Sequence, residues 1–180
     1  KEANYKNLPD ADIILITHGH GDHLDKSAIR EIHTDTTVII LTEATAGSIE
    51  NGRIMKNGET ILIDGITVEA VPAYNTSDGR ERFHPKGRDN GYVLTLGSKR
   101  FYFAGDTENT PEMMALDDIY VAFLPVNQPY TMVPEQAAAA ARAFKPEILY
   151  PYHFGRSNVE IITELLADQT DTEVRIRALD

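Results

Sequence analysis

The apolar residues of this chain fall into short continuous runs in its first and last thirds. Such a run is typical of a strand buried on both faces, whereas apolar residues three and four apart indicate a helix. After a polar segment over residues 1–11, which we expect to be irregular, the pattern predicts strand, helix, strand and helix. The expected ranges are Asp12–Thr17, Asp25–His33, Val38–Leu41 and Thr42–Ile49, the last with Thr42 as its N-cap. This alternation is typical of layered α/β proteins.

The middle of the chain carries β-rich runs separated by two-residue turns. Asp64-Gly65 and Gly97-Ser98 each lie between two such runs, which predicts two hairpins. The expected strands are Thr60–Ile63 with Ile66–Val71, and Gly91–Leu96 with Arg100–Ala104. The polar residues 75–91 between the hairpins are expected to form one long loop, and loops of that length in compact domains are often functional.

The last third returns to alternating helices and strands. The expected helices are Pro111–Leu116, Pro134–Phe144 and Asn158–Ala167, and the expected strands are Ile119–Leu124, Ile148–Pro151 and Glu173–Ala178. Because no linker and no repeat of fixed period interrupts the chain, we expect residues 1–180 to form one domain of mixed α/β class.

Composition and charge narrow the functional classes. The 180 residues carry a formal net charge of −11 and no cysteine. The acidic balance disfavours nucleic acid as a partner, because nucleic-acid-binding proteins usually present a basic face. A chain without cysteine works inside or outside the cytoplasm, and we expect the cytoplasm, with export left open. Since the chain begins at Lys1 rather than Met, we expect the intact protein to begin well upstream.

The densest group of potential metal ligands directly follows the first predicted strand. The segment Thr17–His23, with the sequence Thr-His-Gly-His-Gly-Asp-His, holds three histidines and a carboxylate. Imidazole nitrogens and carboxylate oxygens suit zinc, manganese, iron or nickel. His18 and His20 are two positions apart and point the same way from an extended segment, whereas Asp22 and His23 turn toward a second position. The spacing therefore favours two metals over one.

Two further polar side chains follow other predicted strands. Asp106 comes after Arg100–Ala104, and His153 comes after Ile148–Pro151. Taken alone, Asp106 is more typical of a turn and His153 of a structural residue. Because ligand sites gather at the carboxyl ends of neighbouring strands, the two residues together with Thr17–His23 predict a single site at one sheet edge.

In combination and in order, the motifs Thr-His-Gly-His-Gly-Asp-His, Ala-Gly-Asp-Thr and His-Phe-Gly resemble the metallo-β-lactamase fold superfamily, from about residue 12 to residue 155. The stretches Pro111–Met113, Leu124–Val126 and Tyr130–Met132 resemble a prokaryotic branch described only as metal-dependent hydrolases. That branch is similar to the phosphorylated-ascorbate lactonases and, more distantly, to a phospholipase D that releases N-acylethanolamines. The resemblance implies a four-layer αββα sandwich with the metals at one sheet edge. It also implies several strands before the first histidine motif, where this chain has only eleven residues before the predicted strand. We therefore expect an exposed apolar edge on the first sheet.

The resemblance also implies a ligand set. His18 and His20 would bind the first metal, Asp22, His23 and His153 the second, and Asp106 both.

The chain departs from the family pattern at the first metal. Members carry a further histidine after the central hairpin, where this chain has Asn75. Nine residues later comes His84, which we expect to fold back from the loop as the missing ligand. The alternatives are that Asn75 binds weakly or that the first metal site is poor. His33 has no place in this scheme, and we expect it near a helix C-terminus, without a functional role.

The resemblance implies hydrolysis of a small ester, lactone or phosphoester by a metal-bound hydroxide, because two cations that share a water lower its pKa. Asp22 is expected both to bind metal and to orient this nucleophile. The expected cofactor is two divalent metal ions, with zinc first and manganese, nickel or iron as alternatives.

The substrate is expected to be anionic, because the predicted loop is basic within an acidic chain. Arg82 and Arg88 are predicted to bind its anionic group, the alternative being a solvated loop with salt bridges to acidic neighbours. Tyr130 is predicted to line the pocket, and Thr131 either lines it too or caps the alanine-rich helix.

Three functional classes follow from these observations. They are a dinuclear hydrolase of small molecules, a nuclease of the ribonuclease Z type and a metal-binding domain without catalysis. The acidic charge disfavours the nuclease, and the intact ligand set disfavours the non-catalytic domain. We predict a metal-dependent hydrolase of a small-molecule substrate, without a nucleic-acid or membrane partner and with homo-oligomerisation left open.

Overall fold

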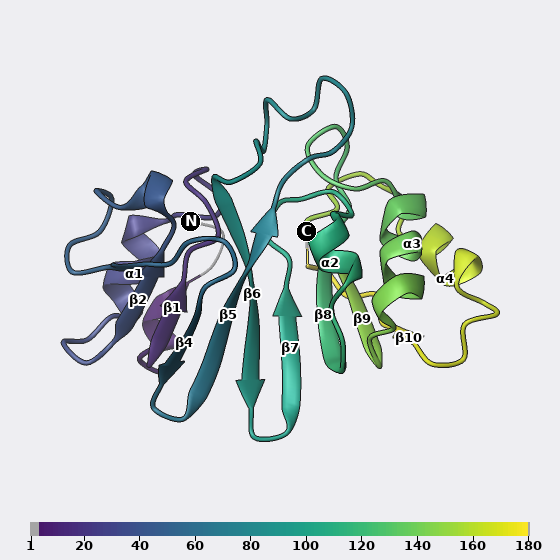
Figure 1. Cartoon of the computed structure of the whole chain (residues 1–180). Coiled ribbons are helices and arrows are strands. Elements are labelled where there is room, and N and C mark those ends of the chain that lie inside the picture. Colours follow the sequence, from purple (N-terminus) through teal and green to yellow (C-terminus); the bar gives the residue numbers. More distant parts are fainter. Residues whose placement is uncertain (1–3, 180) are drawn as a thin grey trace.

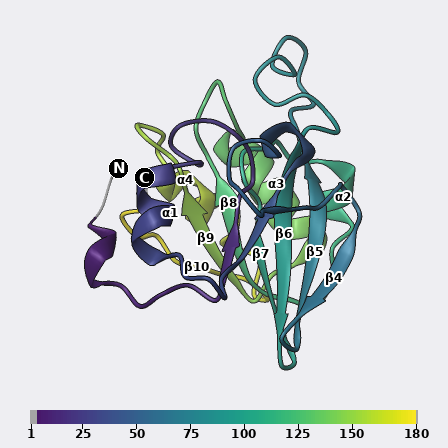
Figure 2. The same ribbon diagram turned by 90° about the vertical axis from the view of Figure 1, so that its left-hand side faces the viewer.

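The computed structural model describes residues 4–179, in which two β-sheets pack face to face with helices on their outer sides (Figures 1 and 2). The smaller sheet is parallel and contains, in spatial order, β1 (Ile13–Leu15), β2 (Val38–Leu41) and β3 (Arg53–Ile54). The larger sheet contains, in spatial order, β10 (Glu173–Val174), β9 (Ile148–Tyr152), β8 (Ile119–Pro125), β7 (Lys99–Phe103), β6 (Asp89–Leu96), β5 (Ile66–Ala73) and β4 (Thr60–Ile63). The helices are α1 (Lys26–Ile32), α2 (Pro111–Met114), α3 (Pro134–Phe144) and α4 (Glu160–Leu165), with 3₁₀ turns at η1 (Tyr5–Asn7) and η2 (Glu43–Thr45).

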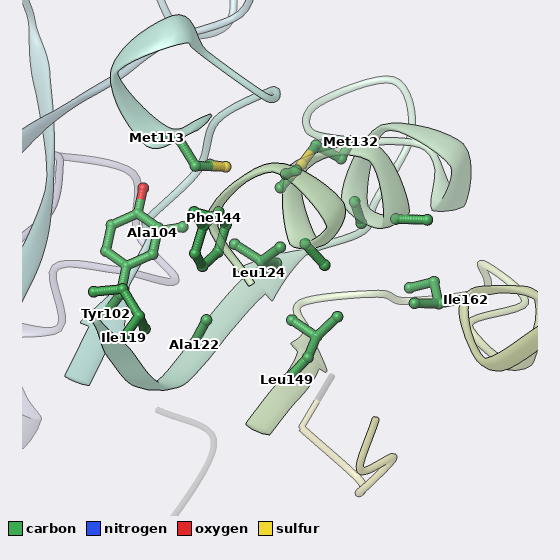
Figure 3. Packing of buried hydrophobic residues seen from close by; sticks show 14 of the residues in the cluster. Tyr102, Ala104, Met113, Ile119, Ala122, Leu124, Met132, Phe144, Leu149 and Ile162 are labelled. Atoms are coloured by element: carbon green, nitrogen blue, oxygen red, sulfur yellow. The ribbon is translucent and has the colours of Figure 1, made fainter. Parts of the chain in front are cut away.

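Three apolar clusters separate the four layers. Ile29 of α1 packs against Ile39 and Leu41 of β2, and Ile40, on the other face of β2, packs against the larger sheet. The third cluster lies between the larger sheet and α2, α3 and α4, and includes Tyr102, Met113, Leu124, Leu149 and Ile162 (Figure 3). The small side chains of Ala137, Ala138, Ala140 and Ala141 are all buried on α3, which lets that helix approach the sheet closely. This layering is the predicted αββα sandwich.

Both predicted hairpins are confirmed. Ile63 pairs with Ile66 across Asp64-Gly65, and both turn residues have positive φ, as a type I′ hairpin turn requires. β4 to β7 are antiparallel, whereas β7 to β10 are parallel. The carboxyl ends of β5, β7, β8 and β9 therefore lie at one edge of the larger sheet, and β6 begins there.

The predicted helix over residues 42–49 was wrong beyond its first turn. Thr42 is the N-cap as predicted, but the helix is only the 3₁₀ turn Glu43–Thr45. The hydroxyl of Thr45 accepts the backbone N–H of Thr42 at 3.1 Å, which favours a closed turn over continuation.

Five other expectations also differ from the structure. The predicted loop 75–91 is shorter, because Asp89 and Asn90 already pair with Ala73 and Pro72. The predicted strand Glu173–Ala178 is only β10, and the predicted helix Asn158–Ala167 is only α4. The short strand β3 was not predicted, and residues 5–7 of the segment expected to be irregular form η1. Residues 1–3 of that segment lie outside the described residues.

Among the described residues, β1 is an edge strand of the smaller sheet, and its three apolar side chains are all partly exposed, as expected of an apolar edge. His33 follows α1 as its C-cap and is exposed, in the position expected for it. Within residues 4–179, no helix has the length and apolar character needed to cross a membrane.

Candidate metal centre

The histidine-rich segment after β1 is held against the larger sheet by backbone and side-chain contacts. The backbone N–H of Asn90 donates to the carbonyl of Thr17 at 3.0 Å, which ties the start of β6 to the start of the loop. The N–H of His23 donates to the carbonyl of His20 at 3.0 Å, so the chain turns within the motif. Asp25 then caps α1 by accepting the N–H of Ser27 at 2.7 Å, which ends the loop at a fixed point.

Asp106 lies at the centre of the cluster, directly after β7. Gly105 before it has φ +66°, and a Cβ there would lie 3.0 Å from both the carbonyl oxygen of Asn90 and the Cβ of Thr17. Only glycine fits this left-handed position between the Asn90 backbone and the Thr17 side chain. The hydroxyl of Tyr152 donates to the Gly105 carbonyl at 3.1 Å, and Asp106 is only 2% exposed.

His84 reaches the centre from the loop between β5 and β6. Its side chain is fully buried, and its Nε2 lies 3.4 Å from Oδ2 of Asp106. Its Nδ1 donates to Oδ2 of Asp89 at 3.1 Å, and Arg88 holds Asp89 with two hydrogen bonds of 2.8 Å. Although burial alone would raise the pKa of Asp89, the bonds from His84 and Arg88 hold that pKa below its usual value. The ionised Asp89 fixes the tautomer of His84 and leaves the Nε2 lone pair pointing at the centre.

The cluster contains two groups of side chains whose potential ligand atoms all lie within 4.8 Å of one another. The first group is His18, His20, His84 and Asp106, and the second is Asp22, His23 and His153. Asp106 also faces the second group, because its Oδ1 lies 3.4 Å from Nε2 of His23 and its Oδ2 lies 3.8 Å from Nε2 of His153. All seven predicted ligands are therefore together.

His153 joins the second group from the end of β9. Its backbone has φ +48°, a left-handed conformation that is uncommon for a residue other than glycine. In this orientation its Nε2 lies 3.1 Å from Oδ2 of Asp22, and its Nδ1 lies 3.4 Å from the amide of Asn127. Burial would raise the pKa of Asp22, but the contact with His153, the nearby His23 and a hydrogen bond from its own backbone together lower that pKa, so Asp22 is a carboxylate.

The donor set fits divalent cations. Nε2 of His23, Nε2 of His84 and Oδ1 of Asp106 are buried without a hydrogen-bond partner. Buried acceptors that face one another are unfavourable unless a proton or a cation lies between them. Burial and the neighbouring histidines lower the pKa of His18 far below its usual value, and burial also lowers the pKa of His23 although Asp106 and Asp22 oppose the shift. Neutral imidazoles of this kind are the form that binds metal.

The comparisons with known proteins agree with this chemistry. The family model of the β-lactamase superfamily domain matches residues 1–154. The chain belongs to this superfamily. A metal-dependent hydrolase of the UPF0173 group from Methanopyrus kandleri is 34% identical over 164 residues, which are 86% of this chain and 71% of that protein. A second UPF0173 hydrolase, from Methanosphaera stadtmanae, is 35% identical over 92% of this chain and 76% of its own length.

Solved structures share the fold of this chain. A candidate metal-dependent hydrolase from Parabacteroides distasonis is 51% identical with a TM-score of 0.95, and the match covers 99% of this chain and 81% of that chain. Igni18, a metallo hydrolase from Ignicoccus hospitalis, is 24% identical with a TM-score of 0.75, over 93% of this chain and 76% of that chain, and shows the fold alone. The protein is thus a metal-dependent hydrolase of the metallo-β-lactamase superfamily.

The three residues predicted to bind substrate differ in their position relative to the metal centre. Tyr130 borders a cavity of about 380 Å³ above the ligands. Arg88 does not border it, because its guanidinium binds Asp89 and the carbonyl of Phe83. Arg82 is exposed, with its guanidinium carbon 4.7 Å from the centroid of the Phe83 ring.

Asn75, the alternative ligand, is 2% exposed, and its Oδ1 is buried without a hydrogen-bond partner. Its amide nitrogen donates to the carbonyls of Arg80 at 3.2 Å and Tyr130 at 2.8 Å, and its backbone N–H donates to the carbonyl of His84 at 2.9 Å. Thr131 neither lines the cavity nor caps α3; its hydroxyl accepts the backbone N–H of Asn127 at 2.7 Å. Asn75 thus has the contacts of a loop anchor.

Sequence reasoning missed the roles of three residues beside the ligands. Asp89 orients His84, Asn127 contacts His153, and Phe83 borders the cavity. Asp89 and Phe83 are close to His84 in the sequence, so the acidic residue within the basic loop and the neighbouring aromatic ring were usable signals. Asn127 carried no such signal, because its partner is 26 positions away.

Replacement of Asp89 with Asn should weaken the affinity of one metal by about ten- to a hundredfold, the usual cost of removing an outer carboxylate partner of a histidine ligand. The amide keeps the shape of Asp89 but removes the charge that fixes the His84 tautomer. Titration of the metal-free protein with Zn²⁺ measures the effect, and Asp78→Asn, in the same loop but absent from both ligand groups, is the matched control. Equal affinities in the wild type and Asp89→Asn would contradict this role.

Proposed function

We propose that the centre holds two divalent metal ions, with zinc first among them, and that the enzyme hydrolyses a small ester, lactone or phosphoester. The observation that supports two ions is that the side chains form two groups, and that the carboxylate of Asp106 faces both of them. His18, His20 and His84 would hold the first ion and Asp22, His23 and His153 the second. Two such ions supply an activated water and polarise the bond under attack.

Asp22 is proposed as the catalytic residue that orients the attacking water. Its side chain is 56% exposed, and it borders both the cavity of about 380 Å³ and a neighbouring one of about 540 Å³. Nε2 of His153 lies 3.1 Å from Oδ2 of Asp22, so the two side chains converge on the position proposed for the second ion. A carboxylate of this kind accepts a hydrogen bond from water and aligns it with the substrate.

An anionic substrate stays a prediction that depends on Arg82. Arg88 is engaged with the buried Asp89, whereas Arg82 is exposed beside the cavity wall. Arg82→Ala should therefore raise KM for an anionic substrate without changing metal content. Arg88→Ala should instead weaken the metal centre through Asp89.

Metal analysis followed by a substrate screen tests the proposal. The purified protein should contain two equivalents of metal, lose activity on chelation and regain it with Zn²⁺, Mn²⁺, Ni²⁺ or Fe²⁺. The screen uses phosphodiester, phosphomonoester, lactone and carboxylic ester substrates, each with the metal-loaded and the chelated protein. A metal-loaded protein that hydrolyses none of these classes would contradict the proposed reaction, and a single equivalent of metal would contradict the dinuclear centre.

A further inference from the structure

The cavity above the ligands has one polar wall and one aromatic wall. Its lining residues are His20, Asp22, His84, Asp106 and His153 on the ligand side, and Phe83, Asn127 and Tyr130 elsewhere. The rings of Phe83 and Tyr130 meet edge to face, with centroids 5.0 Å apart and planes inclined by 77°. Tyr130 is nevertheless 46% exposed, so much of its ring is free to contact a bound molecule.

We infer that Phe83 and Tyr130 bind the non-reacting part of the substrate, and that this part is an uncharged aromatic or similarly flat apolar group. The inference rests on the proposed function, because it concerns the substrate of the same centre. It adds Phe83 as a specificity residue and assigns a chemical class to the group beyond the reacting bond.

Hydrogen bonds to their backbones hold both rings in place. The carbonyl of Phe83 accepts from Nη2 of Arg88 at 2.7 Å, and the carbonyl of Tyr130 accepts from the buried amide of Asn75 at 2.8 Å. The N–H of Tyr130 also donates to the carbonyl of Asn127 at 2.9 Å. A wall that is ordered before binding loses little conformational entropy when a ligand arrives, so these two rings are suited to bind a flat group.

The lining of the cavity offers no cationic partner to a second strongly anionic group of the substrate. Among the described residues, neither this cavity nor its neighbour of about 540 Å³ is lined by a lysine or arginine. Arg80, Lys86 and Arg88 are engaged with Glu108, Glu112 and Asp89, at 2.8, 3.2 and 2.8 Å, and Arg82 lies over the Phe83 ring without lining either cavity. The charged centre therefore binds the reacting group of the substrate, and the aromatic wall binds an uncharged group.

The test compares two phosphonates that present the same anionic group to the metal-loaded protein. Isothermal titration measures binding of phenylphosphonate and methylphosphonate without requiring turnover. Phenylphosphonate should bind about tenfold more tightly, as expected from one aromatic contact of ~1.4 kcal/mol. Tyr130→Ala and Phe83→Ala should each reduce this ratio to about twofold or less, whereas binding of methylphosphonate should stay within about twofold of the wild type.

Tyr120→Ala is the matched control, because Tyr120 lies near the opposite end of β8 from the ligands and is absent from both cavities. Tyr130→Phe should keep the ratio. Equal binding of the two phosphonates by the wild type, or an unchanged ratio in Tyr130→Ala, would overturn the inference. If Phe83→Ala weakens both phosphonates equally through its neighbour His84, the Tyr130→Ala ratio decides. A preserved phenyl preference in a protein that hydrolyses no substrate would contradict the proposed reaction but not the binding wall.

Discussion

Replacement of Asp106 with Asn should lower kcat/KM by on the order of 10³-fold or more, the scale expected when a charge that organises the reacting groups is removed. Asp106 is the side chain whose carboxylate faces both ligand groups, with its oxygens 3.4 Å from His23 and 3.4 Å from His84. Asn keeps the shape but offers one neutral oxygen. We expect metal content to fall from two equivalents to one or fewer, as measured by elemental analysis after dialysis.

The metal-free form of Asp106→Asn should be at least as stable as the metal-free wild type. In the wild type Oδ1 of Asp106 is buried without a partner, and an amide N–H in its place can donate to a histidine nitrogen. Added metal should then raise the unfolding temperature of the wild type, because a ligand that binds the folded state stabilises it. It should have little effect on the unfolding temperature of the variant, which binds metal weakly. Asp171→Asn, an exposed carboxylate beside Lys145, is the control. Full metal content and activity in Asp106→Asn would contradict the bridging role.

The sequence predicts an element correctly where the apolar pattern indicates its type and local residues mark its ends. Val38–Leu41 is a continuous apolar run, and its last three residues are buried. Pro134–Phe144 begins with proline in its first turn and ends at Lys145, which is left-handed just before Pro146. In contrast, Arg53–Ile54 is exposed on both residues and is a strand only because it pairs with β2, which no local pattern can reveal.

The residues of the candidate site also fall into those that local sequence predicts and those that depend on tertiary contacts. The segment Thr17–His23 and the residues that follow β7 and β9 are predictable, because strand ends place their side chains at a shared edge. The partners that orient the ligands depend on tertiary contacts, such as Asn127 beside His153. The engagement of Arg88 by Asp89 also required the structure, because a basic residue in a polar loop is equally consistent with binding a substrate.

Replacement of His84 with Ala should remove the first metal and leave the second. His84 is the member of the first group that lies far in sequence from the Thr17–His23 motif and comes from a loop rather than from a strand end. Without it, His18 and His20 would retain only Asp106 as a third ligand, which the proposed second metal would share. We expect the affinity of the first metal to fall by about a hundredfold or more and kcat to fall with it, because the loss of a direct ligand should exceed the usual ten- to hundredfold effect of an outer-sphere partner.

Asn75→Ala separates His84 from the alternative ligand. If Asn75 anchors the loop, this variant should lose about 1–3 kcal/mol of stability, because the carbonyls of Arg80 and Tyr130 lose their buried donor, and should keep two metals. If Asn75 were the ligand, metal loss would follow Asn75→Ala and His84→Ala would keep full metal content and activity. His33→Ala, an exposed histidine at the end of α1, controls for the loss of an imidazole elsewhere in the chain. The residue whose replacement removes the first metal is therefore its remaining ligand. The fully buried Nε2 of His84, 3.4 Å from Asp106, favours His84.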